Sequence, residues 1–167
     1  MGLARARRPQ EHHVGGLAQE VELGQRWAIC WRFTERWKAD REARRRHALW
    51  FIRHLPTSEV AGTPYVELDP FLDPAAYDEA RTAWVLHLEE HAGDPPLLWN
   101  AASFFTHGDP ALAGRLLRKG RALQPDEPRW TSELAHQYLL RAARRDGGYE
   151  KRLARRAIRL YVRDRAL

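Results

Sequence analysis

The 167-residue sequence contains a single cysteine and no long apolar run. Cys30 therefore has no partner for an intrachain disulfide, and nothing indicates an oxidising compartment. No stretch approaches the roughly 18 apolar residues that are needed to cross a bilayer. The basic N-terminus is not followed by the apolar core of a signal peptide. We therefore expect a protein without a membrane span that is located in the cytoplasm.

Motifs that carry catalytic chemistry are also scarce. The sequence has no phosphate-binding loop, no glycine-rich dinucleotide turn and no Gly-x-Ser-x-Gly elbow. One stretch, His87-Leu88-Glu89-Glu90-His91, matches the H-x-x-E-H zinc pattern, in which two histidines on one helix face hold the metal. No third ligand suggests itself. We expect no catalytic centre, no cofactor and no bound metal, and a metal-dependent hydrolase is the disfavoured alternative.

Charge is unevenly distributed along the chain. The net charge is +6, yet residues 57–110 carry one Lys or Arg against ten acidic residues. Residues 1–56 carry 12 Lys or Arg against 6 acidic residues, and residues 141–167 carry 10 against 3. Charge balance within a compact fold explains this pattern most simply, and a basic docking surface is the alternative.

Apolar periodicity predicts helices and no strand. After residues 1–24, which we interpret as a flexible basic leader, residues 25–167 are expected to form one domain. Its helices are predicted over seven ranges: 25–38, 40–55, 74–91, 97–106, 110–123, 130–144 and 149–162. An irregular insertion over residues 56–73 separates the second and third helices. Because it contains six apolar side chains, we expect this insertion to pack against the core rather than to act as a mobile lid.

The helices repeat with a period of 34 residues, because Asn100–Phe104 aligns with Leu134–Tyr138. The unit from residue 95 to residue 128 resembles the tetratricopeptide repeat (TPR) in its anchor residues, which are Ala101, Phe104, Ala113, Leu117, Gly120 and Pro125. The resemblance is weaker over the next unit and loose over residues 40–91. It implies a short right-handed α-solenoid of about three TPR-like helical hairpins, with capping helices at the N- and C-terminal ends.

The resemblance also implies a function. In that family the first helix of each hairpin lines a concave groove that binds a protein or peptide. The corresponding side chains here are Leu98, Trp99, Phe105, Thr106, Arg129, Glu133, His136 and Leu140. Trp99 and Phe105 would anchor an apolar segment of the partner, and Arg129 and His136 would orient a carboxylate. The expected function is therefore that of a non-catalytic adaptor or scaffold.

Seven arginines near the C-terminus suggest a second binding mode. They are Arg141, Arg144, Arg145, Arg152, Arg155, Arg156 and Arg159. We interpret them mainly as the polar outer face of the C-terminal cap, and nucleic acid or an acidic partner is the alternative ligand. A monomer is favoured over a homodimer, although the tryptophan-rich range 25–38 could mediate pairing if it does not dock on the first hairpin.

Asn100 stands where the repeat usually has a large apolar residue. A buried amide must be hydrogen-bonded, so we expect its side chain to tie a neighbouring turn or stretch of backbone.

Overall fold

Helices are the main secondary structure of the described part of the chain. The computed structural model describes residues 41–143 and 150–164, so the predicted leader and the predicted helix over residues 25–38 lie outside the described residues. The described part contains six α-helices and no strand. They are α2 (Arg41–His54), α3 (Pro74–Glu90), α4 (Pro95–Gly108), α5 (Pro110–Leu123), α6 (Pro128–Ala142) and α7 (Lys151–Asp164). The all-α prediction is confirmed.

Three of these helices begin with the same local device. Asp73, Asp94 and Asp109 are N-caps, and the side chain of each accepts a hydrogen bond from the amide three residues later. A proline follows each aspartate, where its fixed φ suits the first helical turn and its missing N–H costs nothing. In α6 the N-cap is Glu127, which again precedes a proline. These caps fix where each helix starts and therefore keep the connections short.

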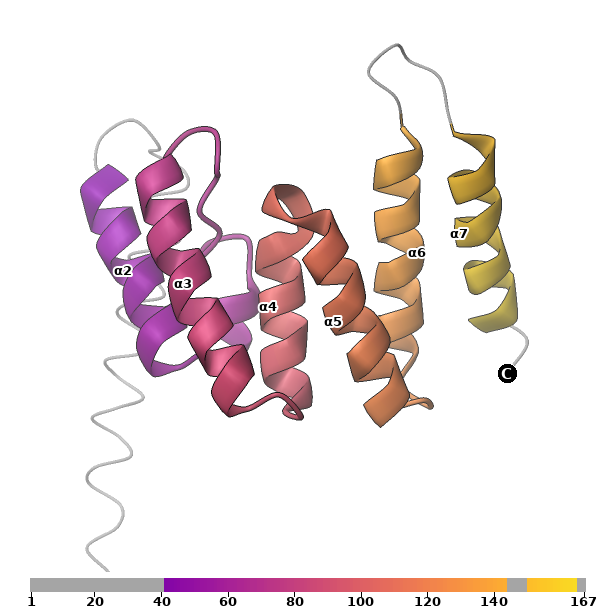
Figure 1. Ribbon diagram of the computed structural model, residues 1–167, viewed down its shortest axis with the longest axis horizontal. Coiled ribbons are helices and arrows are strands. Elements are labelled where there is room, and N and C mark those ends of the chain that lie inside the picture. Colours follow the sequence, from indigo (N-terminus) through magenta and orange to yellow (C-terminus); the bar gives the residue numbers. More distant parts are fainter. Residues whose placement is uncertain (1–40, 144–149, 165–167) are drawn as a thin grey trace, which may run out of the picture.

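The helices follow one another in a row from α2 to α7, as Figure 1 shows. Each packs against the next along the chain, and a short 3-10 helix, η1 (Glu59–Gly62), lies against α4 and α2. The core runs along this row, and its largest fully buried side chains include Trp84, Phe105 and Trp130. Small residues such as Ala101 and Ala113, both 0% exposed, allow α4 and α5 to approach closely.

Much of the insertion over residues 56–73 is packed against the core, as the sequence predicts, although Phe71 and Leu72 are 85% and 50% exposed. Ala61, Val66 and Leu68 are buried within it. The amide nitrogen of Asn100, in α4, donates hydrogen bonds to the carbonyl oxygens of Pro56 at 2.8 Å and Ser58 at 2.7 Å. Asn100 is only 3% exposed, so the prediction for this residue is confirmed.

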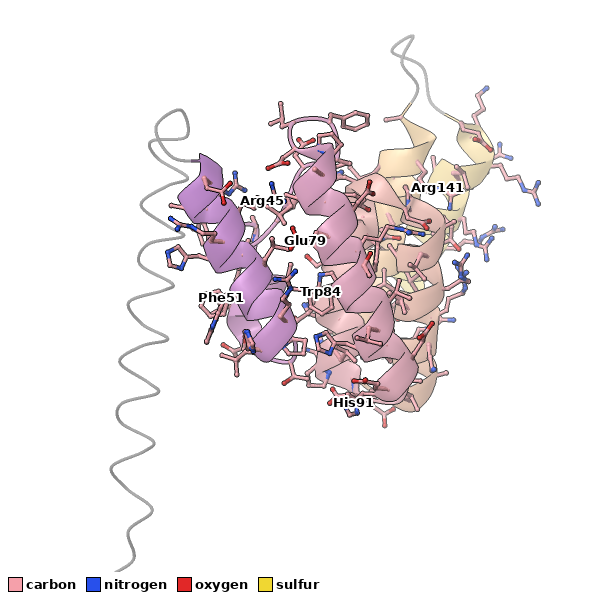
Figure 2. All side chains as sticks on the ribbon, turned by 60° about the vertical axis from the view of Figure 1, so that its left-hand side comes forward. Arg45, Phe51, Glu79, Trp84, His91 and Arg141 are labelled. Atoms are coloured by element: carbon pink, nitrogen blue, oxygen red, sulfur yellow. The ribbon has the colours of Figure 1, made fainter. Side chains whose placement is uncertain are left out.

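A charged contact joins α2 to α3 at one end of the row. Arg45 and Arg53 on α2 both donate hydrogen bonds to the carboxylate of Glu79 on α3, and Figure 2 shows Arg45 and Glu79 facing each other. The hydrogen bond from Arg45 has the largest effect, and together with the bond from Arg53 it holds the pKa of Glu79 below its ordinary value.

Within residues 41–143 and 150–164, no helix has the length and apolar character required to cross a membrane.

Candidate partner-binding surface

An arginine lies over two tryptophan rings where α4 meets α6. The guanidinium carbon of Arg129 is 5.0 Å from the ring centre of Trp99 and 5.1 Å from that of Trp130. The two indoles meet edge to face with their centres 5.4 Å apart. Stacking restricts the arginine side chain while its N–H groups remain available to an acceptor. The arrangement therefore provides a pre-oriented cation that suits a carboxylate.

Trp130 is the fixed base of this arrangement. It is fully buried, and its indole N–H donates to the side-chain oxygen of Gln124 at 3.1 Å. The ring lies against Gly120 of α5, where a Cβ atom would collide with the six-membered ring of the indole. A glycine at this position is therefore needed for α6 to approach α5. Gly120 was among the predicted anchor residues of the repeat, whereas Trp130 was missed, although a tryptophan in the first turn of a predicted helix was a signal for it.

The predicted positions on α6 lie along one strip. Arg129, Glu133, His136 and Leu140 follow each other at spacings of four, three and four residues, so they share one side of the helix. The Nδ1 atom of His136 lies 3.4 Å from a carboxylate oxygen of Glu133. Leu140 is 43% exposed. The strip thus combines a cation, an acid–imidazole pair and an apolar side chain.

Thr106, on α4, is bonded to the part of α6 that adjoins this strip. Its hydroxyl donates to the carbonyl oxygen of Ala102 at 3.0 Å and accepts a hydrogen bond from Gln137 at 3.1 Å. Gln137 is 5% exposed and was not among the predicted site residues. Together with the contact between Trp99 and Trp130, this bond places the outward sides of α4 and α6 next to each other. Six of the eight predicted residues are therefore brought onto one surface.

The other two predicted groove residues are buried, and their placement on the surface was wrong. Leu98 is 1% exposed and Phe105 is 0% exposed, and both belong to the main core. Successive residues of an α-helix point about 100° apart. Trp99 and Thr106 occupy the narrow accessible side of α4, so their immediate predecessors turn into the packed side. Neither Leu98 nor Phe105 is available to a partner in this structure.

The predicted basic patch is only partly described. Arg144 and Arg145 lie outside the described residues. Arg141 lies near the end of α6, and Arg152, Arg155 and Arg159 are exposed on α7 (Figure 2 labels Arg141). Arg156 is also exposed, and its guanidinium carbon lies 4.7 Å from the ring centre of Tyr138 on α6. The described arginines of the patch are therefore all solvent-facing, and one of them also contacts α6.

The H-x-x-E-H pattern falls at the end of α3. His87 packs its ring against Trp84, and His91 is the C-cap, so the two histidines have different surroundings. Among the residues that the structure describes, no group of three or more His, Cys, Asp or Glu side chains is placed to hold a metal ion.

A separate pocket of about 370 Å³ lies between α2 and α3. Its charged lining includes the ion-paired Arg45, Arg53 and Glu79, which already satisfy one another. The pocket does not adjoin the surface formed by α4 and α6.

Comparison with known proteins identifies no relative. No protein-family model matches the chain, and no curated protein or solved structure is significantly similar to it.

Proposed function

We propose that the protein is a non-catalytic adaptor, built as a short TPR-like solenoid, that binds a protein or peptide on the surface formed by α4 and α6. The observation that carries the proposal is Arg129 stacked on Trp99 and Trp130, with the α6 strip continuing from it. Aromatic and arginine side chains dominate the binding energy of protein interfaces. A rigid aromatic base also lowers the entropy lost when the arginine binds.

The arrangement of the helices supports the solenoid part of the proposal. Each α-helix packs on its neighbours in sequence, as expected for stacked hairpins. The equivalent alanines Ala101 and Ala135, 34 residues apart, are both fully buried in the first helix of a hairpin. The same offset relates α4 to α6, so in such a solenoid both would line the groove.

The insertion limits how far this groove can extend. The insertion is attached to α4 through Asn100 and through Ser103, whose hydroxyl donates to the carbonyl oxygen of Gly62 at 3.2 Å. It therefore occupies the space on the α2 side of α4. We infer that the partner contacts the surface from Trp99 to Leu140 rather than a groove along all three hairpins.

Site-specific photo-crosslinking tests the proposal. A benzophenone amino acid is introduced at His136 or Leu140, with the exposed Arg115 on α5 as the control position. After irradiation in native extract, we expect the same crosslinked protein from both α6 positions and not from the control. The identified partner is then purified and titrated against the wild type and Arg129→Ala.

The expected result of that titration is a loss of affinity of about tenfold or more for Arg129→Ala, which corresponds to a hot-spot arginine. Arg115→Ala should bind like the wild type. Equal affinity for Arg129→Ala, or identical crosslinks from the control position, would contradict binding at this surface.

A further inference from the structure

Helix α7 has two apolar faces, and only one of them is packed. Leu153, Ala157 and Leu160 lie against Ala135 and Tyr138 of α6 and their neighbours. The second face contains Ile158, Tyr161 and Val162, which are 56%, 37% and 64% exposed. Three exposed apolar side chains gathered on one side of a 14-residue helix point to a contact.

The order of the helices indicates what kind of element would cover this face. Helix α5 packs on α4 with one side and on α6 with the other, where Gly120 meets Trp130. Helix α7 follows α6 as α5 follows α4, and α7 is the last helix in the row of Figure 1. Among the described residues, none occupies the position beyond α7 that α6 has beyond α5. An element that stacked on α7 in the same way would be a helix.

The spacing of the apolar side chains on the second face of α7 also fits packing against a helix. Ala154, Ile158 and Val162 are four residues apart and form one ridge along α7. Such ridges pack into the grooves of another helix. The ridge spans two turns, or about 12 Å at 1.5 Å per residue, so a partner helix of about three turns would cover it.

Cationic side chains lie along the outer edge of this ridge. At about 100° per residue, Lys151, Arg155 and Arg159 project beside Ile158 and Val162, on the side away from α6. All three are exposed, and within the described part of the chain none of them pairs with a carboxylate. A second α7 docked against this edge would bring like charges together, whereas acidic residues would complement it.

We propose that the outer face of α7 docks an acidic amphipathic helix of a partner protein. The apolar side of that helix covers Ile158 and Val162, and its carboxylates face Lys151, Arg155 and Arg159. This site lies at the end of the row and is separate from the surface formed by α4 and α6. Nucleic acid fits the face less well, because phosphates gain nothing from Ile158 and Val162.

The probe for the test is a labelled, end-capped peptide of about 18 residues, with leucines on one helical face and glutamates along its edge. A matched peptide carries lysines in place of the glutamates. Fluorescence anisotropy with the full chain should show binding of the acidic peptide and at least tenfold weaker binding of the lysine peptide. Affinity for the acidic peptide should fall as the salt concentration rises.

Variants locate the binding site. Ile158→Ser should weaken binding of the acidic peptide by about tenfold or more, and Arg155→Glu combined with Arg159→Glu should weaken it similarly at low salt. Leu86→Ser and Arg115→Glu are the matched controls, because Leu86 is 53% exposed and Arg115 is an exposed arginine on another helix. Both controls should bind like the wild type, and circular dichroism should show that all variants remain helical.

Several outcomes would overturn the proposal. They are no binding of the acidic peptide, equal binding of the lysine peptide, and binding that Ile158→Ser leaves unchanged. Light scattering that detects a dimer in the wild type but not in Ile158→Ser would assign this face to a second copy of the chain. Tight binding of a nucleic-acid oligomer that depends on the arginines but not on Ile158 would assign it to nucleic acid.

Discussion

Replacing Asn100 with alanine should loosen the insertion and lower the stability of the whole domain. The side-chain amide of Asn100 makes two hydrogen bonds, to the carbonyl oxygens of Pro56 and Ser58. A neutral hydrogen bond contributes about 1 kcal/mol to stability, and each carbonyl left without its donor adds a desolvation cost. Pro56 and Ser58 are only partly buried, so water can reach them and limit that cost. We therefore expect the free energy of unfolding to fall by about 2–3 kcal/mol.

Urea denaturation followed by circular dichroism measures this loss, and hydrogen exchange locates it. The amides of Ala61, Thr63 and Val66 form the turns of the insertion through hydrogen bonds to Ser58, Val60 and Thr63. They should exchange faster in Asn100→Ala than in the wild type, and by more than the change in global stability accounts for. Ser103→Ala is the control, because it removes one bond at an exposed position and should cost less than about 0.5 kcal/mol.

An aspartate at the same position sharpens the test. Asn100→Asp has nearly the same shape but places a carboxylate against the two carbonyl oxygens, so it should destabilise more than alanine at neutral pH. Burial and these oxygens raise the pKa of the new carboxyl group in the folded state. Stability relative to the wild type should therefore recover as the pH falls below that raised pKa. If Asn100→Ala costs less than about 0.5 kcal/mol and exchange in the insertion is unchanged, the reasoning is refuted.

Three further substitutions test other contacts by urea denaturation. Gly120→Ala should lower the free energy of unfolding by about 2 kcal/mol, because the collision of its Cβ atom with Trp130 outweighs the gain of about 1 kcal/mol in helix propensity. Gly93→Ala should be neutral, because a Cβ atom at this position meets no other atom. Equal effects of the two substitutions would contradict the packing argument. Tyr77→Phe should leave stability unchanged or raise it by up to about 1 kcal/mol, because the buried hydroxyl has no hydrogen-bond partner. Burial, and to a lesser extent Asp109, raise the pKa of Tyr77 in the folded state. The contribution of Tyr77 to stability is therefore present below the pKa of the unfolded state and is lost as the pH rises toward the pKa of the folded state, so the advantage of phenylalanine should grow above about pH 10. A difference in stability that stays constant with pH would count against this reasoning. Glu79→Gln should lower the free energy of unfolding by less than about 1 kcal/mol in low salt, because its ion pairs are partly exposed. Since the pKa of Glu79 is lowered in the folded state, this loss should vanish as the pH falls through that pKa. A loss of stability that persists in acid would show a different cause.

Local signals predicted most of the helices, and they failed where one signal had two meanings. The pairs Asp73-Pro74 and Asp109-Pro110 correctly marked helix starts. Asp94-Pro95 does the same, but the predicted helix began only at residue 97. The second proline at residue 96 obscured the cap, although the first turn of a helix tolerates both because its N–H groups have no intrahelical partner.

The candidate surface was less predictable than the helices because it depends on how each helix is rotated. Periodicity indicated that α4 is largely apolar but not which narrow side stays accessible. Leu98 and Phe105 were therefore misplaced next to the correctly placed Trp99 and Thr106. The contact of Arg129 with Trp99 joins α6 to α4, and no spacing within α6 reveals it.

The attachment of the insertion to α4 changes how the molecule can come apart. In a row of helices that touch only their neighbours, each interface is a separate point of opening, and the ends open most easily. The bonds from Asn100 span more than 40 residues of sequence and join the first hairpin to the second. At the other end, α7 packs chiefly on α6. Local opening should therefore be polarised: α2 to α4 open as one unit, whereas α7, which is held chiefly through α6, can open without them, and a helix bound on the outer face of α7 would protect that end.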